Sequence, residues 1–378
     1  MTLNRRFARV REQLSKESSS LSKTGFWEAI MPRISQGFVI PIISNSLRIE
    51  QIFREERQIP DQSAETSQSE AEDLTVEEQL TEEWANFIGY PMPDIHNLAR
   101  VAQYFLVEQK DNLSARAKYL EFLKTFLLTI TQDDEDYKDL ASKLLMQVQE
   151  QHFSEIARLL DYPRFPEGVE DPLRLLARLP LPIYITTSYY DFLERALEAE
   201  NKKPRTQVCF WSGARSSART EHWYDPDYEP IPQEPIVYHL YGLEDYPQTL
   251  VLSEDDFINF LVSVVEDTDT QNPIVPLKLR GKLAEQTLLL LGYQLRDWDF
   301  RVLFRFIAKF RKEDLSPPRG MIIQLKRDKK RTGNLEKSLQ YLNRYFDKRQ
   351  FDVEWSEAES FVQELWAKWN EYNRQGQS

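Results

Sequence analysis

The stretch that decides the fold is "PLPIYITTSYYDFLERAL", residues 180–197. Its β-branched and apolar run at 183–187 is typical of a short buried strand, and the segment that follows has the spacing of an amphipathic helix. A strand that enters a helix through a tight turn is the repeating unit of α/β proteins. The turn holds Ser188 and Asp191, and it lies where such proteins commonly bind ligands.

The same alternation of strands and helices continues on both sides of this stretch. Because most of the predicted strands are continuously apolar, we expect a mostly parallel sheet that is covered by helices on both faces. The predicted class is α/β, a Rossmann-like doubly wound sheet with an inserted helical module. The expected strands are 37–43, 183–187, 206–210, 236–241, 286–292, 320–325 and 350–355.

Composition limits the classes of function. The chain has 378 residues, of which 41% are hydrophobic, enough for one large domain or two ordinary ones. The single cysteine, Cys209, excludes an internal disulfide and a four-cysteine zinc site, and it suits a reducing cytosol. A net charge of −13 disfavours nucleic acids and anionic membranes as partners. We therefore expect a cytoplasmic protein without a membrane or direct nucleic-acid partner.

Four parts are expected along the chain. Residues 1–36 have the pattern of N-terminal helices. Residues 61–160 combine an acidic, serine-rich loop with segments whose apolar residues recur three and four apart, which predicts the helical insertion. The sheet domain would then be formed by 37–60 and 161–325, and residues 326–378 would complete the sheet with a last strand and helix.

Polar residues follow the first predicted strand, at the edge where parallel sheets bind ligands. Ser44, Asn45 and Ser46 stand there. A dinucleotide site usually has glycines at this point, so that backbone N–H groups can approach a pyrophosphate at a helix start. The three residues predict either an ordinary helix cap or an altered phosphate loop.

Two further strand ends carry candidate chemistry. Ser188 and Asp191 predict either a cap for the following helix or a reactive turn, although a serine without a nearby base is not a nucleophile. His239 and Tyr241 are two residues apart on a predicted strand, so we expect both side chains on the same side. A histidine at the carboxyl end of a strand is either a general base or a packed core residue.

Three segments together resemble the sirtuin-like domains of bacterial defence and conflict systems. They are "YITTSYYDFLERAL" (184–197), "VYHLYGLEDYPQTLVLSEDDFINFL" (237–261) and "LLLLGYQLRDWDFRVLF" (288–304), and the resemblance covers about 36–48 and 170–310. It implies a Rossmann-like domain with an inserted helical module. Active members of that family bind NAD and cleave its nicotinamide–ribose bond.

The family's usual motifs are replaced in this chain. Residues 44–46, Ser-Asn-Ser, stand where the family has Gly-Ala-Gly after its first strand. Ser188 stands at the asparagine of Thr-Thr-Asn-Tyr-Asp, and Tyr241 with Gly242 stands at His-Gly. The segment from Gly292 onward matches the family's Gly-Tyr-Ser-Leu, apart from a glutamine at the serine. The replacements favour nucleotide binding over catalysis.

The resemblance implies two sets of site residues around an NAD molecule, with no metal and no zinc. The candidate catalytic residues are Ser188, Asp191, His239 and Tyr241. The candidate cofactor-binding residues are Ser44, Asn45, Ser46, Thr187, Gly242, Gly292, Tyr293 and Gln294.

The function expected from this resemblance is binding of NAD or an NAD-derived nucleotide in a bacterial defence or conflict system. Two alternatives stay open. One is an NAD glycohydrolase that uses relocated residues. The other is a structural subunit that assembles with itself or with a defence-system partner. A protein deacylase fits less well, because deacylating sirtuins generally carry a four-cysteine zinc module and this chain has one cysteine.

Overall fold

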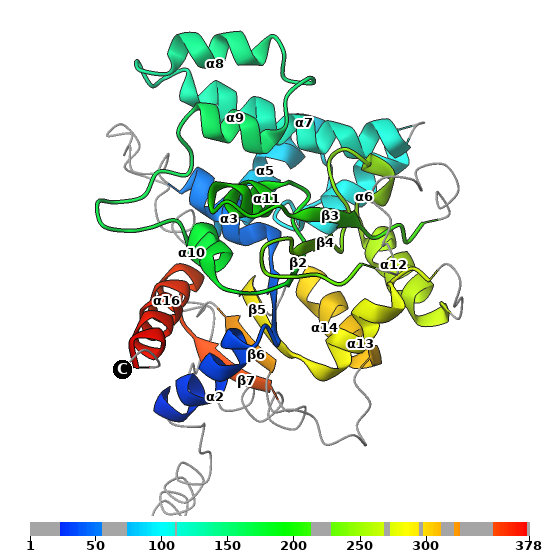
Figure 1. Cartoon of the computed structure of the whole chain (residues 1–378). Helices are drawn as coiled ribbons and strands as arrows, with labels where there is room; N and C mark the ends of the chain where they lie inside the picture. Colours follow the sequence, from blue (N-terminus) through cyan, green and yellow to red (C-terminus); the bar gives the residue numbers. More distant parts are fainter. Residues whose placement is uncertain are drawn as a thin grey trace, which may run out of the picture.

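The fold is taken from a computed structural model of the chain (Figure 1). The first predicted N-terminal helix and most of the acidic loop lie outside the described residues, as does the chain between the last two strands. The described residues are 23–54, 74–109, 112–212, 228–267, 273–294, 298–310, 321–325 and 351–375.

One parallel sheet of seven strands forms the centre of the molecule, in the order β3-β4-β2-β1-β5-β6-β7. All of its neighbouring strands pair in parallel, which confirms the predicted Rossmann-like α/β class. The strands are β1 (Val39–Ile43), β2 (Ile183–Thr186), β3 (Arg205–Val208), β4 (Ile236–His239), β5 (Thr287–Tyr293), β6 (Met321–Leu325) and β7 (Phe351–Trp355).

The middle strand β1 sets the position of the ligand-binding edge. Its Ile42 pairs with Ile185 of β2 on one side and with Leu290 of β5 on the other. From β1 the next strands of the chain lie on one side of the sheet, and β5 to β7 lie on the other side. The carboxyl end of β1 is therefore a topological switch point, where open α/β sheets form a crevice.

Two groups of helices cover the sheet, which explains why the inner strands are apolar along their whole length (Figure 1). In the first group, α10 contacts both α11 and α16, and α16 contacts α2. In the second group, α14 contacts α12 and α13. The helices are α2 (Lys23–Ser35), α10 (Pro172–Arg178), α11 (Phe192–Ala199), α16 (Ala358–Gln375), α12 (Glu254–Glu266), α13 (Leu277–Glu285) and α14 (Trp298–Phe310).

The helical module lies between β1 and β2 in the chain and is drawn above the carboxyl edge of the sheet in Figure 1. It is tied to the sheet domain by contacts of α5 with α3 and of α6 with α12. None of the helices described here has the length and apolar character that a membrane span requires. The helices of the module are α5 (Val76–Ile88), α6 (Leu98–Glu108), α7 (Asn112–Thr131), α8 (Lys138–Leu145) and α9 (Phe153–Leu159), and α3 (Asn45–Phe53) is the helix that follows β1.

Two of the candidate glycines have clear conformational roles. Gly242 follows β4 with φ of +95°, and an added Cβ would lie 2.6 Å from the backbone of Thr249. Gly292 lies in β5 with φ of +78°, and an added Cβ would lie 2.9 Å from the Cβ of Leu47 on α3. Both positions require glycine because they combine a left-handed backbone with close packing.

Replacing Gly242 tests whether both the left-handed backbone and the close packing require glycine at this position. We expect Gly242→Ala to lower the free energy of unfolding by about 2–4 kcal/mol, because the methyl group adds a clash to the backbone strain. The control is Gly89→Ala, where φ is +67° but no atom lies within 4 Å of the added Cβ. Urea unfolding measures both variants, and equal losses would contradict the role of the Thr249 contact.

Candidate functional site

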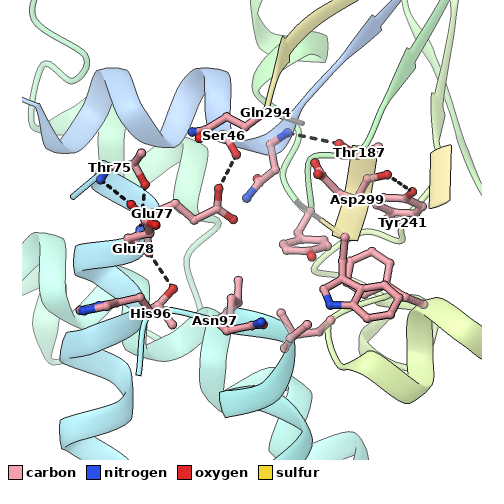
Figure 2. Close-up of a pocket in the computed structure, with 18 of the residues that line it drawn as sticks. Ser46, Thr75, Glu77, Glu78, His96, Asn97, Thr187, Tyr241, Gln294 and Asp299 are labelled. Carbon is pink, nitrogen blue, oxygen red and sulfur yellow. Dashed lines mark hydrogen bonds between the residues drawn. The ribbon is translucent and has the colours of Figure 1, made fainter. Parts of the chain in front are cut away.

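A cleft of about 300 Å³ lies at the carboxyl edge of the sheet, between the strand ends and the helical module (Figure 2). Its volume is at the lower end of the range for small-molecule sites. On the sheet side it is lined by Asn45, Thr187, Tyr241 and Gln294. On the side of the module, residues at the starts of α5 and α6 complete the wall.

The loops that the sequence singled out meet at this cleft. Asn45 and Ser46 come from the start of α3, directly after β1. Thr187 follows β2, Tyr241 follows β4, and Gln294 follows β5. Segments that are more than a hundred residues apart in the chain thus form one wall, because parallel strands end at the same edge.

The backbone N–H groups at the start of α3 already have hydrogen-bond partners within the protein. The Ser44 side chain accepts a hydrogen bond from the N–H of Ser46 at 3.2 Å, so Ser44 acts as a helix cap. The N–H of Asn45 donates to the Thr187 hydroxyl at 3.3 Å, and the N–H of Leu47 donates to the Ser44 carbonyl at 3.3 Å. These three N–H groups have partners, in contrast to those of a glycine-rich phosphate loop.

Ser188 joins two loops but does not line the cleft. Only 8% of its surface is exposed. Its hydroxyl donates to the side-chain oxygen of Asn45 at 3.2 Å and accepts from the N–H of Tyr190 at 3.2 Å. The serine therefore fixes the orientation of Asn45, which does line the cleft.

Asp191 points toward the helical module rather than into the cleft. It occupies the N-cap position of α11, but its carboxylate does not cap that helix. Instead it accepts a hydrogen bond from Ser154 and pairs with Arg195 at 3.1 Å.

His239 is a core residue in this structure. Its side chain is fully buried, with Nδ1 2.9 Å from the Ser188 carbonyl and Nε2 2.8 Å from the Glu194 carboxylate. Burial opposes protonation of this ring, but the adjacent Glu194 carboxylate outweighs it and raises the pKa of His239. Both ring nitrogens are engaged by protein groups, and the ring does not line the cleft.

Tyr241 lines the cleft, so the expectation that it shares a side with His239 is wrong. The strand β4 ends at His239, and the chain turns before Tyr241. The Tyr241 ring packs against Phe257 and Phe260 of α12, and its hydroxyl donates to the Asp299 carbonyl at 2.7 Å. Burial raises the pKa of Tyr241 well above its ordinary value, so the phenol keeps its proton.

The other candidate binding residues lie in or behind the wall. Gln294 lines the cleft, and its amide is 3.5 Å from the Glu50 carboxylate. Tyr293 is buried behind it and shares a hydrogen bond of 3.3 Å with the Thr187 hydroxyl. Gly242 lies in the loop after β4 and Gly292 in β5, and neither glycine lines the cleft.

The acidic residues of the cleft were missed by the sequence analysis. Glu77 and Glu78 of α5, Asp94 before α6 and Asp299 of α14 line it, and no lysine or arginine does so among the described residues. Asp299 lies within a stretch that resembles the sirtuin-like family, but its role was not visible there. Nothing in the local pattern around Glu77 pointed to the cleft.

Two of these carboxylates accept hydrogen bonds from the serines at the start of α3. The Ser46 hydroxyl donates to Glu77 at 2.5 Å, and the Ser44 hydroxyl donates to Asp299 at 3.4 Å. Burial raises the pKa of Glu77 despite the hydrogen bond from Ser46, and the charge of Glu50 adds to this effect. Burial, followed by the nearby charge of Glu77, raises the pKa of Asp299 to about 7.

A second group of titratable side chains lies outside the cleft. The ligand atoms of His152, Asp191 and Glu244 lie within 4.8 Å of one another, close enough to hold a metal ion. Cationic partners are already present, however. Lys124 pairs with Glu244 at 2.8 Å, and the hydrogen bond with Glu244 raises the pKa of His152 to about 9. The group is therefore an ionic network that ties α7 and α9 to the loops after β2 and β4.

Comparison with known proteins agrees with this geometry. Residues 182–346 match the family model of the SIR2-like domain. The chain is 24% identical over 168 residues to the NAD(+) hydrolase ThsA of Bacillus cereus (strain MSX-D12), a match that covers 44% of this chain and 30% of that protein. It is 25% identical over 195 residues to the NAD(+) hydrolase ThsA of Acinetobacter baumannii (strain 532279), covering 49% of this chain and 35% of that protein. The chain thus spans about a third of the length of these curated relatives.

Removing the imidazole of His239 should mainly affect stability. We expect His239→Ala to lower the free energy of unfolding by about 3 kcal/mol, because it leaves the buried carboxylate of Glu194 without its charged partner. The control is His152→Ala, whose side chain is 41% exposed and should matter less. Urea unfolding compares the two, and a stable His239→Ala protein would contradict the structural role.

The carboxylate of Asp299 should make stability depend on pH. Its pKa is about 7 in the folded chain against an ordinary value of 3.8, so between these values the folded state binds a proton that the unfolded state lacks. The free energy of unfolding should therefore fall as pH rises from about 4 to about 7. We expect Asp299→Asn to raise the melting temperature by a few degrees at pH 8 relative to the parent chain, and by less at pH 5. A gain that is the same at both pH values would contradict this reading.

Proposed function

This chain carries a SIR2-like domain, and on that premise we propose that its cleft binds NAD or an NAD-derived nucleotide. The observation that carries the proposal is the convergence of the loops after β1, β2, β4 and β5 on one cleft at the switch point of a parallel sheet. Both curated relatives are named as NAD(+) hydrolases, which supports the same class of ligand.

The lining offers suitable groups for such a ligand. Asn45, Thr187 and Gln294 present amide and hydroxyl groups that can bind ribose hydroxyls. Tyr189 and Trp298 present aromatic surface on which an adenine or pyridine ring can pack. The mixed polar and aromatic lining is typical of small-molecule sites.

Binding without rapid cleavage is the form of the proposal that the side chains support best. Ser188, at the family's asparagine, has its hydroxyl engaged with Asn45. Tyr241, at the family's histidine, holds its proton and so is a poor base. His239 is enclosed between Ser188 and Glu194 and cannot replace it.

A second candidate function is NAD glycohydrolase activity, and Asp299 is the observation that favours it. This carboxylate lines the cleft, and its pKa of about 7 allows proton transfer near neutral pH. In this alternative Asp299 would accept a proton from the water that attacks the ribose C1′ atom. The bond between that carbon and nicotinamide would break, and nicotinamide would leave with the bonding electrons.

The remaining alternative is a structural subunit that assembles with itself or with a defence-system protein. Ile258, Val262 and Val265 are exposed on one face of α12, at helical spacing. We also propose, from the resemblance alone, a setting in bacterial defence. Light scattering that finds only monomers would contradict self-assembly, and NAD levels in infected cells that do not respond to the chain would count against the defence setting.

Calorimetry with the full chain tests the main proposal. We expect NAD or ADP-ribose to bind with a Kd of about 1–100 µM, and Gln294→Ala to weaken binding by about tenfold through loss of a cleft hydrogen bond. Gln149→Ala is the matched control, because Gln149 bonds to Glu121 on the helical module and does not line the cleft. No binding heat for either ligand at millimolar concentration would contradict the proposal.

Chromatography of the same samples separates binding from cleavage. Bound NAD that stays intact supports the binding function. Release of free nicotinamide would support the hydrolase instead, and Asp299→Asn should then slow the release by about a hundredfold.

A further inference from the structure

The carboxylate of Glu77 accepts a hydrogen bond from the Ser46 hydroxyl in the first turn of α3, beside the helix end that would otherwise offer its positive dipole to an anion. Glu77 lies in the first turn of α5, and its carboxylate accepts from the Ser46 hydroxyl of the neighbouring helix α3 at 2.5 Å (Figure 2). Negatively charged groups are stabilised at helix N-termini by the helix dipole and the free N–H groups. In this chain a side chain of the helical module takes that position.

The backbone at the same place has little left to donate. The N–H groups of Asn45, Ser46 and Leu47 bond to Thr187 and Ser44, as described above. A phosphate that came to this helix start would have to replace those bonds as well as the contact between Ser46 and Glu77. The groups at this helix start that could bind an anion are thus already bonded to other groups of the protein.

The charge of the cleft wall also disfavours the binding of a phosphate at the start of α3. Glu78 and Asp299 line the cleft together with Glu77, and no lysine or arginine is among the described lining residues. Asp94 also lines the cleft, but its carboxylate is paired with Arg100 at 2.7 Å, and Asp299 adds a negative charge mainly above its pKa of about 7. Negative charges on the cleft wall repel a bound phosphate more strongly in a partly enclosed cleft than they would in bulk water. A pyrophosphate is therefore disfavoured here, whereas a ribosyl pyridinium cation is not.

We propose that Glu77 determines ligand specificity: a dinucleotide binds the cleft only by displacing the Glu77 carboxylate from the start of α3, and phosphate-free pyridine ribosides escape this penalty. The inference rests on the proposed function, since it concerns the same cleft. In the displaced state the Glu77 side chain would take another rotamer on α5, which frees the Ser46 hydroxyl to donate to the incoming phosphate.

Glu77→Gln is the test variant, because it removes the charge and keeps the size and a hydrogen-bond acceptor for Ser46. The matched control is Glu78→Gln. Glu78 lines the same cleft and carries the same charge, but its carboxylate accepts from the N–H of Thr75 in a capping box, a role that glutamine also fills. Circular dichroism and melting curves establish that both variants are folded.

Calorimetry then measures NAD and nicotinamide riboside against the parent chain and both variants. We expect Glu77→Gln to bind NAD about tenfold more tightly than the parent chain, and Glu78→Gln to change the affinity much less. Nicotinamide riboside, which is a cation without phosphate, should bind Glu77→Gln no more tightly than the parent chain.

The outcomes separate this inference from the proposal on which it rests. If the parent chain binds NAD and Glu77→Gln gains nothing beyond Glu78→Gln, the inference is overturned and nucleotide binding stands. Equal gains for NAD and nicotinamide riboside would also overturn it, because phosphate would then be irrelevant. If folded parent and variant proteins all fail to bind NAD and ADP-ribose, both proposals are overturned. Binding of NAD by Glu77→Gln alone would support the inference most directly.

Discussion

The parallel pairing of β1 with β2 on one side and β5 on the other is the constraint on which the rest of the structure depends. It directs the loops after these strands to one edge of the sheet, so residues such as Asn45, Thr187 and Gln294 come together. The helices that cover the sheet bury the inner strands β1 and β2 along their whole length (Figure 1). The cleft is therefore a consequence of strand order before any side chain in it is considered.

The fold could be predicted from the sequence because burial on both faces leaves long apolar runs. All seven strands were expected from the sequence, although the outer strands β3 and β7 are not continuously apolar. The predicted strand ends differ from the observed ones by a few residues at most, as in 236–241 against Ile236–His239. This difference in the end of β4 determines whether His239 and Tyr241 lie on the same side. An alternating pattern places His239 and Tyr241 on one side only while the strand continues, and here the chain turns after His239. Local periodicity does not report where a ladder stops.

The candidate site was predicted in part. The loops around Asn45, Ser46 and Thr187 were identified, because polar residues after buried strands are a local signal. The carboxylate of Glu77 was not identified, because its contact with Ser46 lies between two different helices. No local sequence pattern encodes how two helices pack together. Ser44 and Ser46 donate hydrogen bonds to Asp299 and Glu77, so the loop after β1 holds two of the acids of the cleft.

The ionic network of Lys124, His152, Asp191 and Glu244 has a mechanical consequence. It fastens the helical module to the loops after β2 and β4, at a point away from the cleft. If the mouth of the cleft widens to admit a bulky molecule, the helical module cannot move independently of these two loops. Movement of the module would either shift the loops after β2 and β4 as well or break these charged contacts. The position of the module and the shape of the sheet edge are therefore coupled.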